Sequence, residues 1–306
     1  MAQAALTQPA TERLTPTNAR SRRAIDSGAT IVLWSAASGI VLLLLLFMLY
    51  LFVQGIGVIS WHFLTGSPAA ASAGGGIGPE IFNSFYILIL TLIFTVPIAV
   101  AAGVYLQIYA RPGTFRTLVQ FSAESLATVP SIVMGLFGLL IFVQTFHWHF
   151  TALGGALTLT LLNLPALMRV TQQALEGVPA TFAEASMALG ATKWQTVLRA
   201  ILPSAVGPLT TGIVLVSGRI FGETAALVFT AGASVSYGRS AYDLNPFHTA
   251  ETLAVHLWST HREALVPDAD KIANGSALVL LVMVLIFNVV ARVVGRRLTM
   301  RMTGRS

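Results

Sequence analysis

The residues best placed to do chemistry lie where charge is least expected. Arg219 and Glu223 are four positions apart inside a long apolar run at residues 206–231. A spacing of four puts two side chains on one face of an α-helix, so we expect the guanidinium and the carboxylate to meet. Either charge alone would cost about 2.5–3.5 kcal/mol at the centre of a bilayer. The two charges therefore either hold helices together or line a path for a polar solute.

Small residues accompany these charges. Gly218, Gly222 and Ala226 recur every four positions, which would let a second helix approach the charged face closely. Two more charged residues, Arg169 and Glu124, lie near the ends of other apolar runs, where long side chains can reach the membrane surface. Arg169 thus has two interpretations, as a surface anchor or as part of a solute path.

The composition excludes most classes of protein. Of 306 residues, 55% are hydrophobic and 10% charged, whereas soluble domains are about 25% charged. This composition excludes disordered chains, fibres, nucleic-acid-binding domains and disulfide-rich modules, and it indicates a polytopic membrane protein. The chain has no cysteine, which excludes thiol catalysis and cysteine metal sites. The net charge of +6 does not indicate a nucleic-acid partner, because the basic residues flank the apolar runs.

Six apolar runs are long enough to cross a membrane as helices, which takes about 20 residues each. The chain is therefore predicted to be all-α, with six transmembrane helices. The first run is too long for the core of a signal peptide, so we predict a retained anchor. Prolines within the runs are expected to kink or break their helices. The runs are residues 30–53, 81–106, 119–143, 154–170, 206–231 and 275–294, and the prolines are Pro97, Pro130 and Pro165.

The distribution of basic residues predicts the orientation. The N-terminal tail, the connection after the second run, the region after the fourth run and the C-terminal tail together hold 14 of the 18 Lys and Arg residues. The alternate connections hold 3, and the remaining one is Arg219. Because positive loops stay on the cytoplasmic side, both termini are predicted to be cytoplasmic.

A polar stretch between the fourth and fifth runs predicts two short helices. Pro179 can begin the first, in which Phe182, Ala185 and Leu189 form an apolar stripe, and Gly190 suits a left-handed stop. Thr192 and Gln195 form a capping box for the second helix, which we expect Pro203 to end. Its apolar positions are Trp194, Val197, Leu198 and Ile201. Such a pair is either a docking surface or an interfacial pair lying on lipid headgroups.

The same stretch resembles a known motif. Glu184-Ala185-Ser186, followed by Gly190 and then Leu202-Pro203, resembles the EAA motif of ABC-importer permeases, with Ser186 in place of the third-position alanine. The resemblance implies a type I importer permease (MetI-like) bundle. It also implies that Glu184, Ala185, Ser186, Gly190, Leu202 and Pro203 belong to coupling helices that dock in a groove of an ATP-binding subunit.

A narrower resemblance involves the charged run. Residues 219–225, Arg-Ile-Phe-Gly-Glu-Thr-Ala, resemble the Arg-x-x-Gly-Glu-Thr-Ala signature of phosphate-specific importer permeases, and residues 129–136 and 164–169 are similar to other stretches of that family. Residues 244–247 favour the PstA-type half. This resemblance implies that Arg219, Glu223 and Arg169 act in phosphate translocation.

The implied assembly is a phosphate importer in a bacterial-type inner membrane. It would contain this permease, a homologous permease half, two ATPase subunits and an extracytoplasmic phosphate-binding protein, with no nucleic acid. The chain itself is expected to be non-catalytic and to hold no cofactor or metal. A P-loop is excluded, because Lys193 and Lys271 are followed by Trp194 and Ile272. His147 and His149, which flank Trp148, favour an aromatic belt or plain surface over a metal site.

The expected organisation is a mobile tail at residues 1–28, a first transmembrane helix with an outward loop at 29–80, a permease core at 81–295 and a basic tail at 296–306. The coupling helices fall at about residues 176–203, and an outward region at 234–270 could receive the binding protein. Two alternatives remain. One is a permease for sulfate or molybdate, and the other is an intramembrane enzyme that uses Glu223, for which the apolar runs hold no Ser/His or paired-acid constellation.

Overall fold

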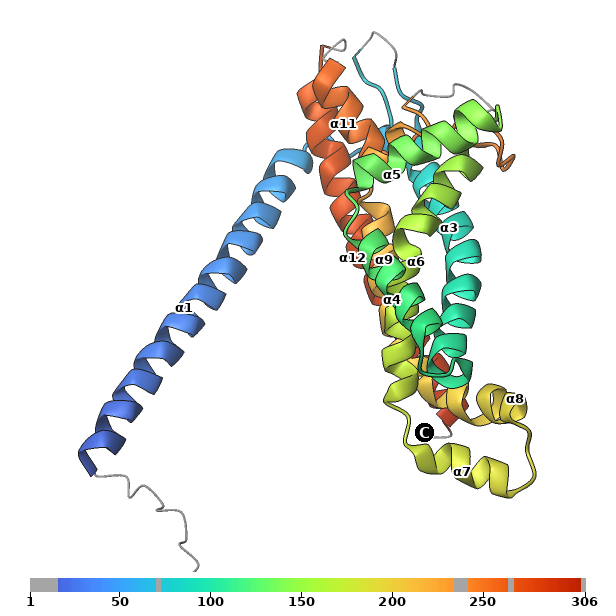
Figure 1. Ribbon diagram of the computed structural model, residues 1–306. Coiled ribbons are helices and arrows are strands. Elements are labelled where there is room, and N and C mark those ends of the chain that lie inside the picture. Colours follow the sequence, from blue (N-terminus) through green and yellow to red (C-terminus); the bar gives the residue numbers. More distant parts are fainter. Residues whose placement is uncertain (1–15, 70–72, 234–241, 264–266, 304–306) are drawn as a thin grey trace, which may run out of the picture. The chain divides into compact units, whose positions relative to one another are not determined.

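The computed structural model describes residues 16–69, 73–233, 242–263 and 267–303, which form helices and connecting segments with no β-strand among them (Figure 1). The first fifteen residues of the expected tail, and residues 234–241 of the outward region, lie outside the described part. The chain divides into two units, residues 1–53 and 54–306. The fold class is all-α, as predicted.

The first unit is carried by one helix, α1 (Pro16–Gly55), of 40 residues. It begins inside the stretch expected to be a mobile tail. Its membrane-length part is Ala24–Gly55, and none of its apolar window is buried. A helix that is apolar all round needs an apolar environment on every side, which lipid provides. The first predicted span is thus a helix long enough to cross a membrane.

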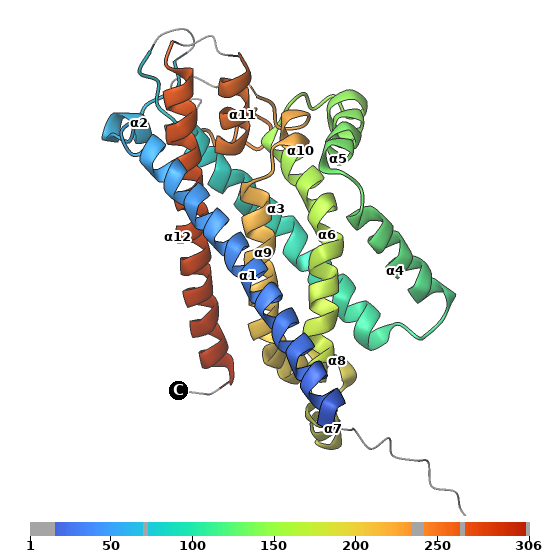
Figure 2. The same cartoon turned by 90° about the vertical axis from the view of Figure 1, so that its left-hand side faces the viewer.

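The second unit is built on four long helices, of which α3 packs against α6, and α9 packs against both α6 and α12 (Figure 2). Small residues allow the close approach: a Cβ on Gly103 would lie 2.6 Å from Thr171. Buried hydroxyls also link the helices, since Thr95 Oγ1 donates to Thr160 Oγ1 at 3.1 Å. The helices are α3 (Gly78–Val104), α6 (Ala152–Glu176), α9 (Leu202–Phe221) and α12 (Ala269–Thr303).

The third apolar run is broken at Pro130, as predicted, and does not form one straight helix. It forms α4 (Thr114–Ala127) and α5 (Ser131–Gly138), which continues as a π-helical turn, and the two parts are bent by 101°. Pro130 causes the break, because it sits at the N-cap of α5 with ψ at 141° and cannot continue a helix. By contrast, Pro97 and Pro165 lie inside the helices α3 and α6.

The two ends of the second unit carry short helices (Figure 1). One end carries α7 (Ala180–Ala188) and α8 (Lys193–Thr196). The other end carries α2 (Trp61–Thr65), α10 (Ala225–Val228) and α11 (Leu253–Glu263). The long helices between them therefore connect two sets of short elements about a membrane thickness apart.

The predicted end of the second short helix at Pro203 is wrong. From α8 the chain runs through a π-helical turn, Val197–Ile201, directly into α9, so that a single helix extends over Lys193–Phe221. Proline has no backbone N–H and its ring crowds the preceding turn, and the wider turn next to Pro203 accommodates both defects. Pro203 lies two residues after this wider turn, inside the continuous helix.

Candidate functional site

The first candidate site is the pair of short helices after α6. Pro179 occupies the N-cap of α7, and Gly190, just beyond its end, has φ of +85°. No atom lies within 4 Å of a Cβ built on Gly190, so the backbone angle, and not space, favours glycine there. The predicted start and left-handed stop of this helix are both confirmed.

The capping box of the next helix is also confirmed. Thr192 Oγ1 accepts from the backbone N–H of Gln195 at 3.3 Å, and Gln195 Oε1 accepts from the N–H of Thr192 at 2.9 Å. At the next residue, the Lys193 Nζ atom donates to the carbonyl of Ile108 at 2.7 Å. These bonds fix where the chain turns from α7 back towards the bundle.

The EAA-like residues separate into an outward-facing and an inward-facing group. Glu184 and Ala185 are exposed, whereas the Ser186 hydroxyl lies 2.9 Å from that of Thr196, which is buried. Leu202 packs on a small core that includes Val197 and Leu209. The motif thus presents its first two positions to the outside and attaches its third to α8.

The predicted apolar stripe on α7 is unpacked. No residue of Ala180–Ala188 is buried, Phe182 is 49% exposed, and Leu189 is 90% exposed. Met187 adds a third exposed apolar side chain on this element. This much exposed apolar surface on a helix outside the bundle is typical of a surface that contacts a partner protein or a membrane.

The second candidate site is at the far end of α9, and here the predicted pairing is wrong. The helix ends at Phe221 with Gly222 as its C-cap, so Arg219 and Glu223 do not share a helical face. Among the described residues no ion pair joins them: Arg219 is exposed, and Glu223 Oε1 accepts from the N–H of Ala226 at 3.4 Å. The Glu223 carboxylate therefore contacts the first turn of α10 instead of Arg219, whose guanidinium stays available.

The small-residue stripe does not act as one surface either, because the same break separates its members. A Cβ on Gly218 would meet only Asn288 at 3.7 Å, and one on Gly222 only the Arg219 carbonyl at 3.9 Å. Ala226 does have a close neighbour, since a Cβ on Gly135 would lie 2.8 Å from its Cα. This contact brings α5 against α10.

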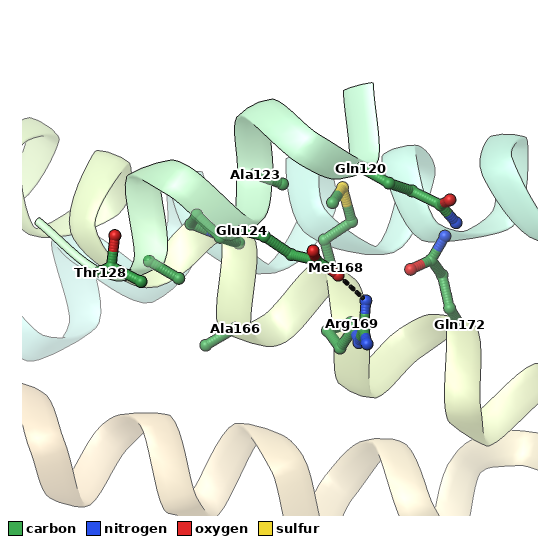
Figure 3. Close-up of a pocket in the computed structure, with 10 residues that line it drawn as sticks. Gln120, Ala123, Glu124, Thr128, Ala166, Met168, Arg169 and Gln172 are labelled. Atoms are coloured by element: carbon green, nitrogen blue, oxygen red, sulfur yellow. Dashed lines mark hydrogen bonds and ion pairs between the residues drawn. The ribbon is translucent and has the colours of Figure 1, made fainter. Parts of the chain in front are cut away.

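Arg169 has a partner that the sequence analysis did not assign. Its Nη1 atom lies 2.6 Å from Glu124 Oε1, which joins α6 to α4, and both side chains are more than half exposed (Figure 3). Both residues lie on the side predicted to be cytoplasmic, Arg169 at the end of the run 154–170 and Glu124 near the start of the run 119–143. That shared location was the signal that could have suggested the pair.

A cavity of about 400 Å³ surrounds this ion pair. The side chains of Gln120 and Gln172 line it, with their amides pointing toward one another (Figure 3). The Gln172 Nε2 atom is buried and has no hydrogen-bond partner among the described residues. A guanidinium and amide N–H groups around one cavity can donate hydrogen bonds to an oxyanion.

Comparison with known proteins gives relatives over most of the chain. The chain is 41% identical over 291 residues to the probable ABC transporter permease protein YqgI of Bacillus subtilis (strain 168), covering 92% of this chain and 99% of the relative. It is 32% identical over 240 residues to the phosphate transport system permease protein PstA of Xylella fastidiosa (strain 9a5c), covering 78% and 80%.

A solved structure has the same fold. A chain from a bacterial alginate ABC transporter, crystallised with an alginate pentasaccharide-bound periplasmic protein, matches with a TM-score of 0.65 at 17% identity, covering 90% of this chain and 97% of that one. Residues 96–304 match the family described as "Binding-protein-dependent transport system inner membrane component". The chain therefore belongs to this family and is a membrane-spanning permease subunit of an ABC importer with the MetI-like fold.

Proposed function

We propose that this chain forms half of the translocation path of an ATP-driven phosphate importer. The observation that carries the proposal is the exposed side chain of Arg219, which has no ion-pair partner in the described part of the chain. Arg219 is the first residue of the run that resembles Arg-x-x-Gly-Glu-Thr-Ala. An unpaired guanidinium can donate two parallel hydrogen bonds to phosphate oxygens. The 32% identity to a phosphate transport system permease supports the choice of anion.

Two arginines would serve the anion in turn. Arg219 lies on the last turn of α9, beside α10, whereas Arg169 lies towards the end of α6 that leads to α7. The ion pair with Glu124 lowers the attraction of Arg169 for an anion, so phosphate would bind there less tightly and leave more readily. Glu223 takes no direct part in this scheme and instead holds α10 in place.

The continuous helix over Lys193–Phe221 provides the coupling between ATP hydrolysis and this path. Its 29 residues extend over about 43 Å at about 1.5 Å each. Ser186 attaches α7 to the first turns of this helix, and Arg219 lies near its other end. Movement of α7 by a motor subunit would therefore displace Arg219 as part of one rigid element, which gives alternating access.

The partners follow from the same scheme. The exposed face of α7, with Glu184, Phe182 and Leu189, would enter a groove of one of two ATPase subunits on the cytoplasmic side. A homologous permease half would complete the path, and an extracytoplasmic phosphate-binding protein would deliver the anion at the α10 and α11 end. Both termini would then be cytoplasmic, and the membrane would be a bacterial-type inner membrane.

Uptake of radiolabelled phosphate by the reconstituted complex tests the role of Arg219. Loss of a charged hydrogen bond costs about 1.5–3 kcal/mol, so Arg219→Ala should lower uptake at limiting phosphate by about tenfold or more. Arg219→Lys should retain part of the activity. The matched control is Arg292→Ala, which removes an exposed arginine from α12. Wild-type uptake by an Arg219→Ala complex that still hydrolyses ATP would contradict the proposal.

A permease for another oxyanion is the second candidate, because sulfate and molybdate also accept hydrogen bonds from arginine. Competition separates the two: a tenfold excess of sulfate or molybdate should leave phosphate uptake unchanged. Strong inhibition by either anion, with uptake of that anion, would replace phosphate as the substrate while keeping the role of Arg219.

A further inference from the structure

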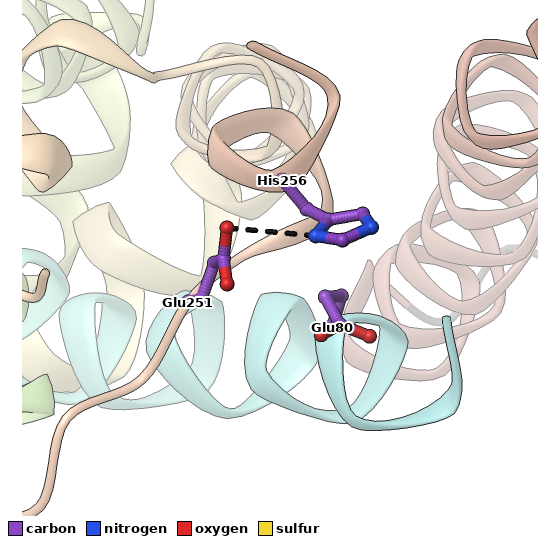
Figure 4. Close-up of side chains that lie close together, drawn as sticks. All are labelled: Glu80, Glu251 and His256. Atoms are coloured by element: carbon purple, nitrogen blue, oxygen red, sulfur yellow. Dashed lines mark ion pairs between the residues drawn. The ribbon is translucent and has the colours of Figure 1, made fainter. Parts of the chain in front are cut away.

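Three ionisable side chains lie together at the α11 end of the second unit, and the transport scheme uses none of them. Glu80 comes from the first turn of α3, Glu251 from the segment before α11, and His256 from α11 itself (Figure 4). Their exposed fractions are 1%, 2% and 7%. Because 171 positions separate the first two along the chain, their contact could not be predicted from the sequence.

The polar atoms at the centre of this group have no partners. Glu80 Oε2, Glu251 Oε2 and His256 Nδ1 are all buried without a hydrogen bond to any described residue. The His256 Nδ1 atom lies 3.5 Å from Glu251 Oε1, which is beyond the usual hydrogen-bond length. Buried groups of this kind are costly unless something satisfies them.

The charge of the group points to a cation. Two carboxylates and one imidazole lie together, and no Lys or Arg forms an ion pair with them in the described part of the chain. The surroundings of the ring therefore attract positive charge strongly.

The spacing of the atoms suits a divalent metal ion. One ligand atom from each residue lies within 4.8 Å of the other two. The 3.5 Å between His256 Nδ1 and Glu251 Oε1 is close to the edge of a tetrahedron with bonds of about 2.1 Å, which is about 3.4 Å.

Hydroxyl groups next to the site form contacts with two of the three side chains, Glu251 and His256. Metal ligands commonly have outer hydrogen-bond partners of this kind. The Ser259 hydroxyl donates to Glu251 Oε1 at 2.9 Å, and the Thr260 hydroxyl lies 3.3 Å from His256 Nε2. When the Thr260 hydroxyl accepts a hydrogen bond from the Nε2–H group, the lone pair of Nδ1 faces the two carboxylates. An outer partner on the second ring nitrogen is typical of zinc-bound histidines.

We propose that Glu80, Glu251 and His256 bind a divalent transition-metal ion, Zn²⁺ by their donor types. Carboxylate oxygens and imidazole nitrogens are both donors that Zn²⁺ accepts, and a water molecule would supply the fourth position. The ion joins the start of α3 to α11. It adds to the hydrogen bonds already there, from Asn83 Nδ2 to the Glu251 carbonyl at 3.1 Å and from Leu253 N–H to Ser84 Oγ at 2.9 Å.

Metal analysis of the full-length chain, purified in mild detergent with the subunits that accompany it, tests the site. After dialysis against a chelator and return of Zn²⁺, the protein should bind about one zinc ion through this site and melt at a higher temperature than the chelated protein. His256→Ala and Glu251→Gln should each lower zinc affinity by more than about tenfold. Mn²⁺ is tested in parallel as the alternative ion.

A second carboxylate–imidazole pair in the same chain provides the control. His248 Nδ1 lies 2.6 Å from Asp243 Oδ2, but both side chains are exposed. His248→Ala should therefore leave zinc binding and the thermal shift unchanged. If His256→Ala does not fold, Thr260→Val keeps all three ligands and should still weaken binding severalfold. The proposal is overturned if wild type binds neither metal, or if His248→Ala and His256→Ala weaken binding equally; the buried carboxylates would then hold a proton instead.

Discussion

The hydroxyls of Ser186 and Thr196 lie 2.9 Å apart and connect α7 to the helix that continues to Arg219. An alanine at position 186 could not form this bond. The substitution of serine within the EAA-like motif therefore adds a polar attachment between the docking helix and the bundle. Thr196 is 2% exposed, so water can replace its lost partner only poorly.

Ser186→Ala should weaken this attachment by about 0.5–1.5 kcal/mol, and it should lower the phosphate imported per ATP hydrolysed. Thr196→Val should have the same effect, and the double variant should be no worse than either single one, because both remove one bond. The matched control is Ser204→Ala, whose hydroxyl bonds only the Ala200 carbonyl in its own helix. An equal fall in the transport ratio for Ser204→Ala would refute the role given to Ser186.

Gly190→Ala should detach the ATPase from this chain. A Cβ at a φ of +85° costs about 1–2 kcal/mol, so the turn between α7 and α8 should rearrange. Gly190→Asn should be milder, since asparagine tolerates left-handed angles. Gly177→Ala is the control, because Gly177 precedes α7 with a φ of −70° and its Cβ would meet atoms no closer than 3.6 Å. Co-purification in mild detergent measures the outcome, and unchanged capture by the Gly190→Ala chain would contradict the docking assignment.

Local signals in the sequence predicted local structure correctly. The capping box of Thr192 and Gln195 and the left-handed stop at Gly190 depend on bonds and angles within a few residues, and both are present. Each of the six apolar runs contains a helix, since length and hydropathy suffice to identify them, although breaks interrupt the third run at residues 128–130 and the fifth at 222–224. The error at Pro203 arose because a proline ends a helix only when the backbone cannot widen around it.

Relationships between distant residues could not be predicted in the same way. Arg219 and Glu223 were paired by helical spacing, but the helix ends between them at Gly222, and hydropathy does not reveal such a break. The contact of Glu124 with Arg169 depends on how α4 packs on α6. In each case the decisive information is the relative placement of helices, which periodicity within one segment does not contain.

Glu124→Gln should change transport more than stability. The ion pair with Arg169 is 2.6 Å long but more than half exposed on both sides, so its loss should alter the free energy of unfolding by less than about 1 kcal/mol. The freed guanidinium should hold phosphate longer, which lowers both the KM for uptake and the maximal rate. Uptake kinetics and thermal unfolding of the same preparation measure both effects. A large loss of stability with unchanged kinetics would show that the pair is only structural.

Single cysteines should establish the orientation, because the natural chain contains none to interfere. Leu189 is 90% exposed beside α7, and Phe247 is 51% exposed at the opposite end of the second unit. If α7 faces the cytoplasm, a membrane-impermeant maleimide should label Phe247→Cys in intact spheroplasts and Leu189→Cys only after the membrane is opened. The cysteine-free chain is the control for background labelling. The reverse labelling pattern would invert the orientation and place the ATPase-docking surface on the wrong side of the membrane. Loss of Leu189→Cys labelling when the ATPase is present would locate the docking contact on this residue.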